Sequence, residues 1–204
     1  KRQFDRLSDR RRPQQRIYGS IGPLEVRLAT SRSEVRAAQR LRYRVFFEEM
    51  SATPSVAAKM RRRDEDAFDP FCDHLLVVER GGDRDPASRG WRRRAIEGRI
   101  VGTYRILRQE IAERHDGFYT QGEYNIAPLL AAKSGAKFME LVRSCVLGTH
   151  RSKRTVELLW HGLWTYVREH GVDVMIGCAS FEGTDPEKHA MALSYLHHVA
   201  KAPP

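Results

Sequence analysis

The stretch FMELVRSCVLGTHRSKRT, residues 138–155, begins as an apolar strand, carries two ionisable side chains and ends in a basic turn. Removing an ionised group from water costs free energy unless it has a partner, so Glu140 and Arg143 need an explanation there. In a regular strand these two side chains point to opposite faces. If both serve one site, the strand must contain a bulge, which re-aims a side chain. The alternative is that one faces solvent, or that each pairs with a structural partner elsewhere.

Strand and helix patterns surround this stretch. Besides the strand that opens it, we expect apolar strands at 24–30, 74–80, 99–108 and 174–181. Helices are expected from a Ser33 cap to about Met50, from about Val156 to His170 with Thr155 as cap, and after Asp185 and Pro186. This order predicts an α/β or α+β fold, a mixed central sheet flanked by helices.

Apolar spacing assigns a buried face to each of the first two helices. On the first helix, one face carries Val35, Ala38, Leu41, Val45 and Phe46, with Arg42 near the same side. On the second helix, the stripe consists of Val156, Leu159, Trp160, Leu163, Trp164 and Val167. Residues 51–71 are expected to form a long connection, and the Gly-rich, charged linker 81–98 a mobile hairpin excursion.

Length and composition predict one domain. The 204 residues are 41% hydrophobic, enough for a single core. Residues 1–20 are expected to be a basic N-terminal arm and residues 21–204 the folded domain. The first residue is Lys and the last four are KAPP, so we expect a chain trimmed from a longer protein, with its C-terminal strands missing.

Cysteine, histidine and apolar patterns exclude several classes. Cys72, Cys145 and Cys178 are far apart and form no CxxC pair, which predicts reduced thiols in a cytoplasmic protein. No HExxH motif is present, and we expect no metal site. No apolar run approaches the ~18 residues that span a bilayer.

The net charge of +10 predicts an acidic partner. Residues 1–16 hold seven Lys/Arg against two Asp, and KMRRR, WRRR and HRSKR add basic clusters. Nucleic acid, anionic lipid and an acidic carrier protein all fit this charge. The chain has no aromatic-basic RNA signature and no clear helix-turn-helix, so nucleic acid is not expected.

Three further features are candidates for a site. An acidic patch, Asp64, Glu65, Asp66 and Asp69, is either a solvated loop or a mouth for a cationic small molecule. Arg105 is a lone charge in an apolar strand, which either forms a buried pair or binds a carboxylate. The turn GTHRSKRT, residues 148–155, brings basic side chains to a helix N-terminus, where a phosphate is favoured.

Several segments together resemble the L-ornithine Nα-acyltransferases of the GNAT acyltransferase superfamily. They are LRYRVFFEEM (41–50), DAFDPFCDHLLVVE (66–79), IVGTYRILR (100–108), ELVRSCV (140–146), LLWHGLWTY (158–166) and GCASFEGTDPEKHAMALSYLHH (177–198). The last segment is the most specific. N-acylhomoserine lactone synthases are similar in LRYRVF, DAFD and the Glu-x-x-Arg strand, but lack the GCASFEGTDP segment.

The resemblance implies a site and a reaction. The residues that match the lactone synthase site are Arg42, Phe46, Asp66, Asp69, Arg105, Glu140 and Arg143. It implies transfer of a 3-hydroxyacyl chain from acyl carrier protein to the α-amine of L-ornithine, giving lyso-ornithine lipid. No bound cofactor is implied, because the carrier's phosphopantetheine thioester is the donor substrate.

Each group of residues then has an expected role. Glu140 is the general base, directly or through a water, and Arg143 and Arg105 bind the ornithine carboxylate while Asp66 and Asp69 hold its side-chain ammonium. The carrier's phosphate and acyl chain are expected to contact Gly148, Arg151, Lys153, Arg154, Thr155, Gly177, Cys178 and Ala179. The basic clusters at 59–63 and 150–154 would dock the carrier. The arm would touch an anionic inner membrane from the cytoplasm.

Alternatives stay open from sequence alone. A lactone synthase would use S-adenosylmethionine, and an acyltransferase could take glutamine, lysine or glycine in place of ornithine. A protein with this fold could also be a non-catalytic module that binds a carrier or a membrane.

Overall fold

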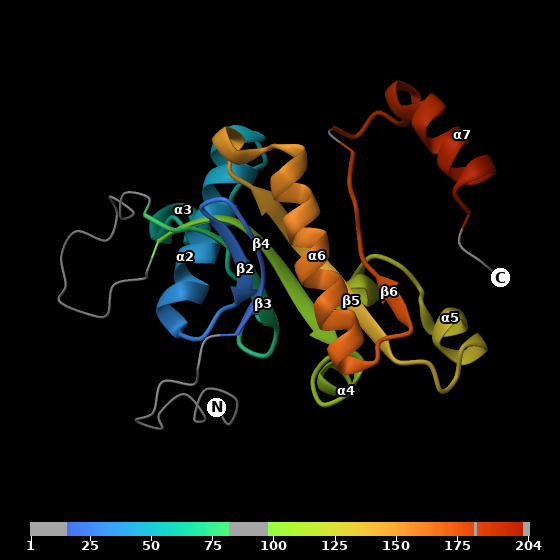
Figure 1. Cartoon of the computed structure of the whole chain (residues 1–204). Helices are drawn as coiled ribbons and strands as arrows, with labels where there is room; N and C mark the ends of the chain where they lie inside the picture. Colours follow the sequence, from blue (N-terminus) through green and yellow to red (C-terminus); the bar gives the residue numbers. More distant parts are fainter. Residues whose placement is uncertain (1–15, 82–97, 182, 202–204) are drawn as a thin grey trace.

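A mixed sheet is the centre of the computed structural model, which describes residues 16–81, 98–181 and 183–201 (Figure 1). The described residues form six strands in the order β1-β2-β3-β4-β5-β6. The strands are β1 (Ile17–Ile21), β2 (Leu24–Leu28), β3 (Asp73–Glu79), β4 (Arg99–Arg108), β5 (Phe138–Val146) and β6 (Val174–Ile176). Neighbours are antiparallel from β1 to β5, and β5 and β6 are parallel.

Helices cover both faces of the sheet (Figure 1). Helix α6 (Lys153–His170) lies on one face, and α2 (Arg32–Tyr43), continued by the π-helix η2 (Arg44–Glu49), lies on the other. Alternate residues of β3 divide between them: Leu75 and Val77 pack with α6, and Leu76 and Val78 with α2. This alternation is the period of two that a sheet buried on both faces requires.

Further short helices lie in the connections between these elements. They are α3 (Val56–Arg61), α4 (Gln109–Ala112), η4 (Tyr119–Gly122), α5 (Ala127–Ala132), η5 (Gly148–His150) and η6 (Pro186–His189). Phe118, at the start of η4, packs with Leu107 and Phe138 in a third cluster between the sheet and residues 109–137. The last helix, α7 (Ala190–Val199), has no buried residue and stands away from the sheet in Figure 1.

The predicted fold class is confirmed: helices flank a mixed sheet, and β2, β3, β4 and β5 lie where the sequence predicts strands. Strand β1 was not predicted, and it occupies part of the range expected for the N-terminal arm. Residues 1–15 of the expected arm and residues 82–97 of the expected hairpin excursion lie outside the described residues.

Both helix caps were predicted too late in the chain. Ser31, not Ser33, caps α2, because its hydroxyl accepts the amide of Glu34 while Ser33 lies inside the first turn. Ser152, not Thr155, caps α6 by accepting the amide of Thr155, whose own side chain is buried. The cap predicted at Asp185 is confirmed, since its carboxylate accepts the Glu187 amide at the start of η6.

The predicted buried stripe of α6 is wrong at three positions. Val156, Trp160 and Trp164 are exposed, and the helix buries Leu158, Leu159, Gly162, Leu163, Tyr166 and Val167. Gly162 explains the orientation, because a Cβ there would lie 2.6 Å from Val26 Cγ2, so the helix packs closest to the sheet at the glycine. The predicted strand at 174–181 is shorter and less buried, because β6 is the edge of the described sheet and pairs only on its β5 side.

Candidate active site

A bulge in β5 brings Arg143 to the same face as Glu140. Thr103 pairs with Cys145 and Arg105 with Val142, so Tyr104 of β4 lies opposite two residues of β5. Arg143 has φ +56°, a left-handed conformation that is uncommon for a side chain other than glycine. The bulge that the opening stretch requires for a shared site is therefore present.

Three arginines and three aspartates meet on this face. The arginines are Arg42 of α2, Arg105 of β4 and Arg143 of β5, and the aspartates are Asp64, Asp66 and Asp69 from the loop after α3. We call these six residues the ionic cluster. It carries equal numbers of positive and negative groups, so it suits a ligand that bears both charges rather than a polyanion.

Asp69 is the buried centre of the ionic cluster. Its carboxylate lies 2.9 Å from Arg42 Nη2 and 3.2 Å from Arg105 Nη1, and it accepts the Gln39 amide at 3.0 Å. Burial alone would raise the pKa of Asp69, but the charge and hydrogen bonds of Arg42, followed by Arg105, hold it well below its usual range. Asp69 therefore stays ionised as a structural anchor, and its carboxylate has no side open to a ligand ammonium.

Asp66 and Arg143 form the accessible edge of the ionic cluster. Arg143 Nη2 lies 3.4 Å from Asp66 Oδ2, and the two side chains are 29% and 24% exposed. The other oxygen of Asp66 accepts a bond from Arg105 Nη1 at 2.5 Å. One cation and one anion thus lie side by side where a ligand can reach them, on a base of buried ion pairs.

Two aromatic rings cover Arg105. Its guanidinium carbon lies 5.6 Å from the ring centre of Phe68 and 5.9 Å from that of Tyr119. The Tyr119 ring also lies 5.4 Å from the guanidinium carbon of Arg143. Arg105 Nε and Nη2 are buried and have no hydrogen-bond partner among the described residues. Arg143, rather than Arg105, is therefore the arginine that a ligand carboxylate can reach directly.

Glu140 is fully buried and bonded to backbone on both oxygens. Oε2 accepts the amide of Tyr119 at 3.1 Å, and Oε1 accepts the amide of Thr120 at 2.6 Å. In the described part of the chain, Glu140 is joined to the ionic cluster through the segment that carries Tyr119. Its role as the general base stays a prediction.

The parallel strands β5 and β6 separate just beyond Glu140. Their pairing ends at Glu140 and Ile176, and a Cβ on Gly177 would lie 2.3 Å from the Leu141 carbonyl oxygen. Only glycine fits there. Cys178 follows, half-buried, with its sulfur 3.6 Å from Thr120 Oγ1, and Ala179 is exposed. The segment predicted to hold the acyl chain thus starts next to the residues that Glu140 anchors.

The basic turn at the start of α6 is engaged in surface contacts. Arg151 lies 2.6 Å from Glu49 and donates to the Val146 carbonyl, and Gly148 faces the same Glu49 carboxylate. Lys153 pairs loosely with Glu157 at 3.7 Å, and Arg154 is exposed. Thr155 is buried and bonded to Ser152 at 3.0 Å. Of the predicted phosphate contacts, Arg151, Lys153 and Arg154 present charge at the surface.

Phe46 does not join the ionic cluster. It is half-buried in η2 and packs with the core under α2. Conversely, sequence reasoning missed Gln39 and Tyr119, and treated Asp64 only as part of the acidic patch. Asp64 lies 2.9 Å from Arg42 Nε.

The two buried cysteines, Cys72 and Cys145, are not set up as nucleophiles. All three cysteines are free thiols. Burial raises the pKa of the Cys145 thiol to about 12 and that of Cys72 further, so both stay protonated near neutral pH. Direct transfer of an acyl group to an amine fits this chemistry better than a thioester on the protein.

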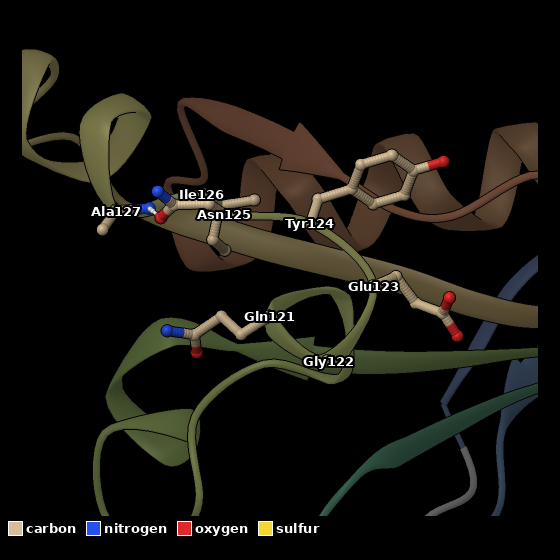
Figure 2. Close-up of a pocket in the computed structure, with 7 residues that line it drawn as sticks. All are labelled: Gln121, Gly122, Glu123, Tyr124, Asn125, Ile126 and Ala127. Atoms are coloured by element: carbon tan, nitrogen blue, oxygen red, sulfur yellow. Dashed lines mark hydrogen bonds between the residues drawn. The ribbon is translucent and has the colours of Figure 1, made fainter.

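A separate hollow of about 330 Å³ lies on the segment between η4 and α5. Figure 2 shows that its side chains point in different directions rather than toward one centre, and it contains none of the predicted site residues. The residues lining it are Gln121, Gly122, Glu123, Tyr124, Asn125, Ile126 and Ala127. In the part of the chain that the structure describes, no cluster of His, Cys, Asp or Glu is arranged to hold a metal ion, and no helix is long and apolar enough to cross a membrane.

Comparison with known families identifies the class of protein. Residues 41–161 match the family described as acetyltransferase (GNAT) domain, a range that contains the end of α2, the ionic cluster, Glu140 and the first half of α6. The chain belongs to the GNAT acetyltransferase family. The relation to the GNAT superfamily that the resemblance implies is confirmed.

Two curated relatives give a finer comparison. An L-ornithine N(alpha)-acyltransferase from Agrobacterium fabrum is 53% identical over 89% of this chain and 59% of its own length. One of the same name from Rhizobium meliloti is 52% identical over 91% of this chain and 60% of its own length. The chain therefore spans about three fifths of the relatives that it matches.

Among solved structures, FeeM, an N-acyl amino acid synthase from uncultured soil microbes, superposes with a TM-score of 0.52. The match covers 85% of this chain and 77% of FeeM, at 17% identity. At that identity the likeness concerns the fold alone.

Proposed function

We propose that the protein transfers a 3-hydroxyacyl chain from acyl carrier protein to the α-amine of L-ornithine, giving lyso-ornithine lipid. The observation that carries this proposal is the pair of Arg143 and Asp66, a cation and an anion 3.4 Å apart at the accessible edge of the ionic cluster. An α-amino acid presents a carboxylate and an ammonium side by side, and can exchange partners with such a pair. The names of relatives at about half identity support ornithine as that amino acid.

In this proposal the arginine-lined edge holds the acceptor. The carboxylate of ornithine binds Arg143 rather than Arg105, because two aromatic rings cover Arg105. Asp66 binds an ammonium group of ornithine. Charge-assisted bonds of this type are each worth about 1.5–3 kcal/mol. Asp69 and Arg42 set the position of both groups without touching the substrate.

The transfer itself needs no group on the protein to be acylated. The α-ammonium gives up one proton to water, and the neutral nitrogen attacks the thioester carbonyl carbon. As the C–N bond forms and the C–S bond breaks, the second nitrogen-bound proton passes to the leaving thiolate. A backbone N–H at the point where β5 and β6 separate donates to the oxyanion that forms on the thioester carbonyl. The segment Gly177 to Ala179 places small side chains beside that point.

The donor end lies at the carboxyl ends of β5 and β6, because the strands are parallel and α6 begins there. Exposed Arg151, Lys153 and Arg154 give that end the positive charge that an acidic carrier and its single phosphate require. A carrier protein as donor, a lipid as product and a cytoplasmic bacterial location belong to this proposal.

Product analysis by mass spectrometry tests the proposal. The chain is mixed with 3-hydroxyacyl carrier protein, a pool of amino acids and S-adenosylmethionine. N-(3-hydroxyacyl)ornithine is the expected product. An acylhomoserine lactone would assign the chain to the lactone synthases. An acylated glutamine, lysine or glycine would correct the acceptor, and the absence of any product would favour a binding module.

A further inference from the structure

Glu140 and Tyr119 are 21 residues apart in the chain, yet a hydrogen bond joins them directly. Glu140 lies on β5, has no exposed surface and accepts two consecutive backbone amides, those of Tyr119 and Thr120. A carboxylate that receives two amide bonds is well satisfied in the absence of water. The two bonds to the Glu140 carboxylate also hold the start of η4 against β5.

The segment that Glu140 holds reaches both ends of the proposed site. On one side the Tyr119 ring lies across Arg143 and Arg105 and meets the Phe68 ring edge-on at 5.8 Å. On the other side Thr120 meets Cys178, next to the point where β5 and β6 separate. Phe118, the residue before Tyr119, is buried in the core. The backbone is therefore held in place both before and after the residue that carries the ring.

A general base in direct contact with an amine needs an oxygen that faces it. Neither oxygen of Glu140 faces the space beside Arg143, because both point at the backbone of η4. A ring over a guanidinium, by contrast, restricts where that guanidinium can point and excludes water from one of its faces. Tyr119 has this relation to two arginines at once.

We propose that Glu140 is a positioning residue and not the general base: its carboxylate fixes η4 so that Tyr119 forms the aromatic wall of the subsite for the amino-acid carboxylate at Arg143. This inference rests on the proposed function. Tyr119 acquires a role in acceptor binding that the sequence did not indicate. Loss of Glu140 then weakens acceptor binding through the displacement of Tyr119.

A double-mutant cycle separates the two roles of Glu140. Glu140→Gln removes one acceptor and places an amide donor against a backbone N–H, and Tyr119→Leu removes the aromatic ring from a half-exposed position. Each is expected to raise the KM for ornithine about 10-fold or more. The double variant should be within about twofold of the worse single variant, because both changes remove the same ring placement.

A base would behave differently. Glu140→Gln would lower kcat about 100-fold or more, leave ornithine affinity unchanged in calorimetry without donor, and cause the same fall in the Tyr119→Leu background. That pattern overturns the proposal. The control is Glu113→Gln, an exposed carboxylate paired with Gln109, which should leave the kinetics unchanged.

Hydrogen exchange provides a readout that is independent of activity. The amides of Tyr119 and Thr120 should be protected in the wild type and exchange markedly faster in Glu140→Gln. Equal exchange would overturn the positioning role. If the wild type makes no N-acylornithine, the proposed function fails while the exchange result still stands. If Glu140→Gln does not fold, an unchanged KM in Tyr119→Leu overturns the proposal.

Discussion

Arg42 and Asp69 are 27 residues apart in the chain, and their side chains meet at 2.9 Å in a site with almost no exposed surface. This ion pair joins α2 to the loop before β3, and its carboxylate, that of Asp69, also contacts Arg105. The accessible pair, Asp66 and Arg143, rests on it. Charges that stabilise the fold and charges that face the substrate are therefore neighbours in one cluster. Substitutions should distinguish them by their different effects on stability and on substrate binding.

Replacing Asp69 with Asn should destabilise the fold. Two buried guanidinium groups, those of Arg42 and Arg105, lose a charged partner, and breaking a buried pair in this way costs about 3–5 kcal/mol. Chemical denaturation measures the change. Arg61→Ala, which removes an exposed pair with Glu65, is the control and should change the stability by less than about 1 kcal/mol. Equal effects of the two variants would contradict the buried anchor.

Arg143 should show the opposite behaviour. Its φ of +56° suits glycine, so Arg143→Gly should keep the stability within about 1 kcal/mol of the wild type. The loss of the guanidinium should raise the KM for ornithine roughly 10- to 100-fold, the equivalent of one charge-assisted bond. Thermal unfolding and steady-state kinetics on the same samples check both parts. An unchanged KM would remove Arg143 from the binding site.

Gly177 should be intolerant of a side chain. A Cβ there meets the Leu141 carbonyl oxygen at 2.3 Å, and forcing β5 and β6 apart should cost about 1–3 kcal/mol and most of the acyl transfer. Gly122→Ala is the matched control, because a Cβ there meets nothing within 4 Å. Product formation and melting temperature are measured for both. Full activity in Gly177→Ala would show that the close approach of Gly177 to β5 is unimportant for the reaction.

Stability should fall in mild acid because of His74. Burial first, with the nearby charges of Arg42 and Arg105, lowers the pKa of His74 below its unfolded value of about 6.5. The unfolded chain therefore binds the proton more readily, so the contribution of His74 is complete above about pH 6.5 and is lost as the pH falls further. Unfolding free energies between pH 7 and 5.5 should slope less steeply in His74→Gln. An identical slope would exclude this group; His170, whose pKa is also lowered, would then be the next candidate.

Much of this architecture follows from local sequence. Period-two and continuous apolar runs predict β2 to β5, and the structure contains the bulge that the two charges in β5 require if both serve one site. The errors have physical causes. The apolar arc of α6 is wide enough to include Trp160 and Trp164, and the close approach of Gly162 to Val26 marks the side that is buried. Tyr119 has no periodic signal, because its place depends on a bond between its backbone and a distant glutamate.

Residues of the ionic cluster show a second limit of prediction from sequence. Asp66, Asp69 and Arg105 were assigned to one substrate, yet spacing cannot tell an exposed carboxylate from one that two arginines already occupy. The structure separates them by burial: Asp66 is accessible, and Asp69 and Arg105 are covered.

The central claim is that Arg143 and Asp66 select an α-amino acid. The most direct measurement compares kcat/KM for ornithine with that for putrescine, which lacks the carboxylate, in the wild type and in Arg143→Gln. The wild type should prefer ornithine by roughly 100-fold or more, and Arg143→Gln should lose most of that preference, because one charge-assisted contact carries it. The same preference in both proteins, or acylation of putrescine as fast as of ornithine by the wild type, would contradict the claim.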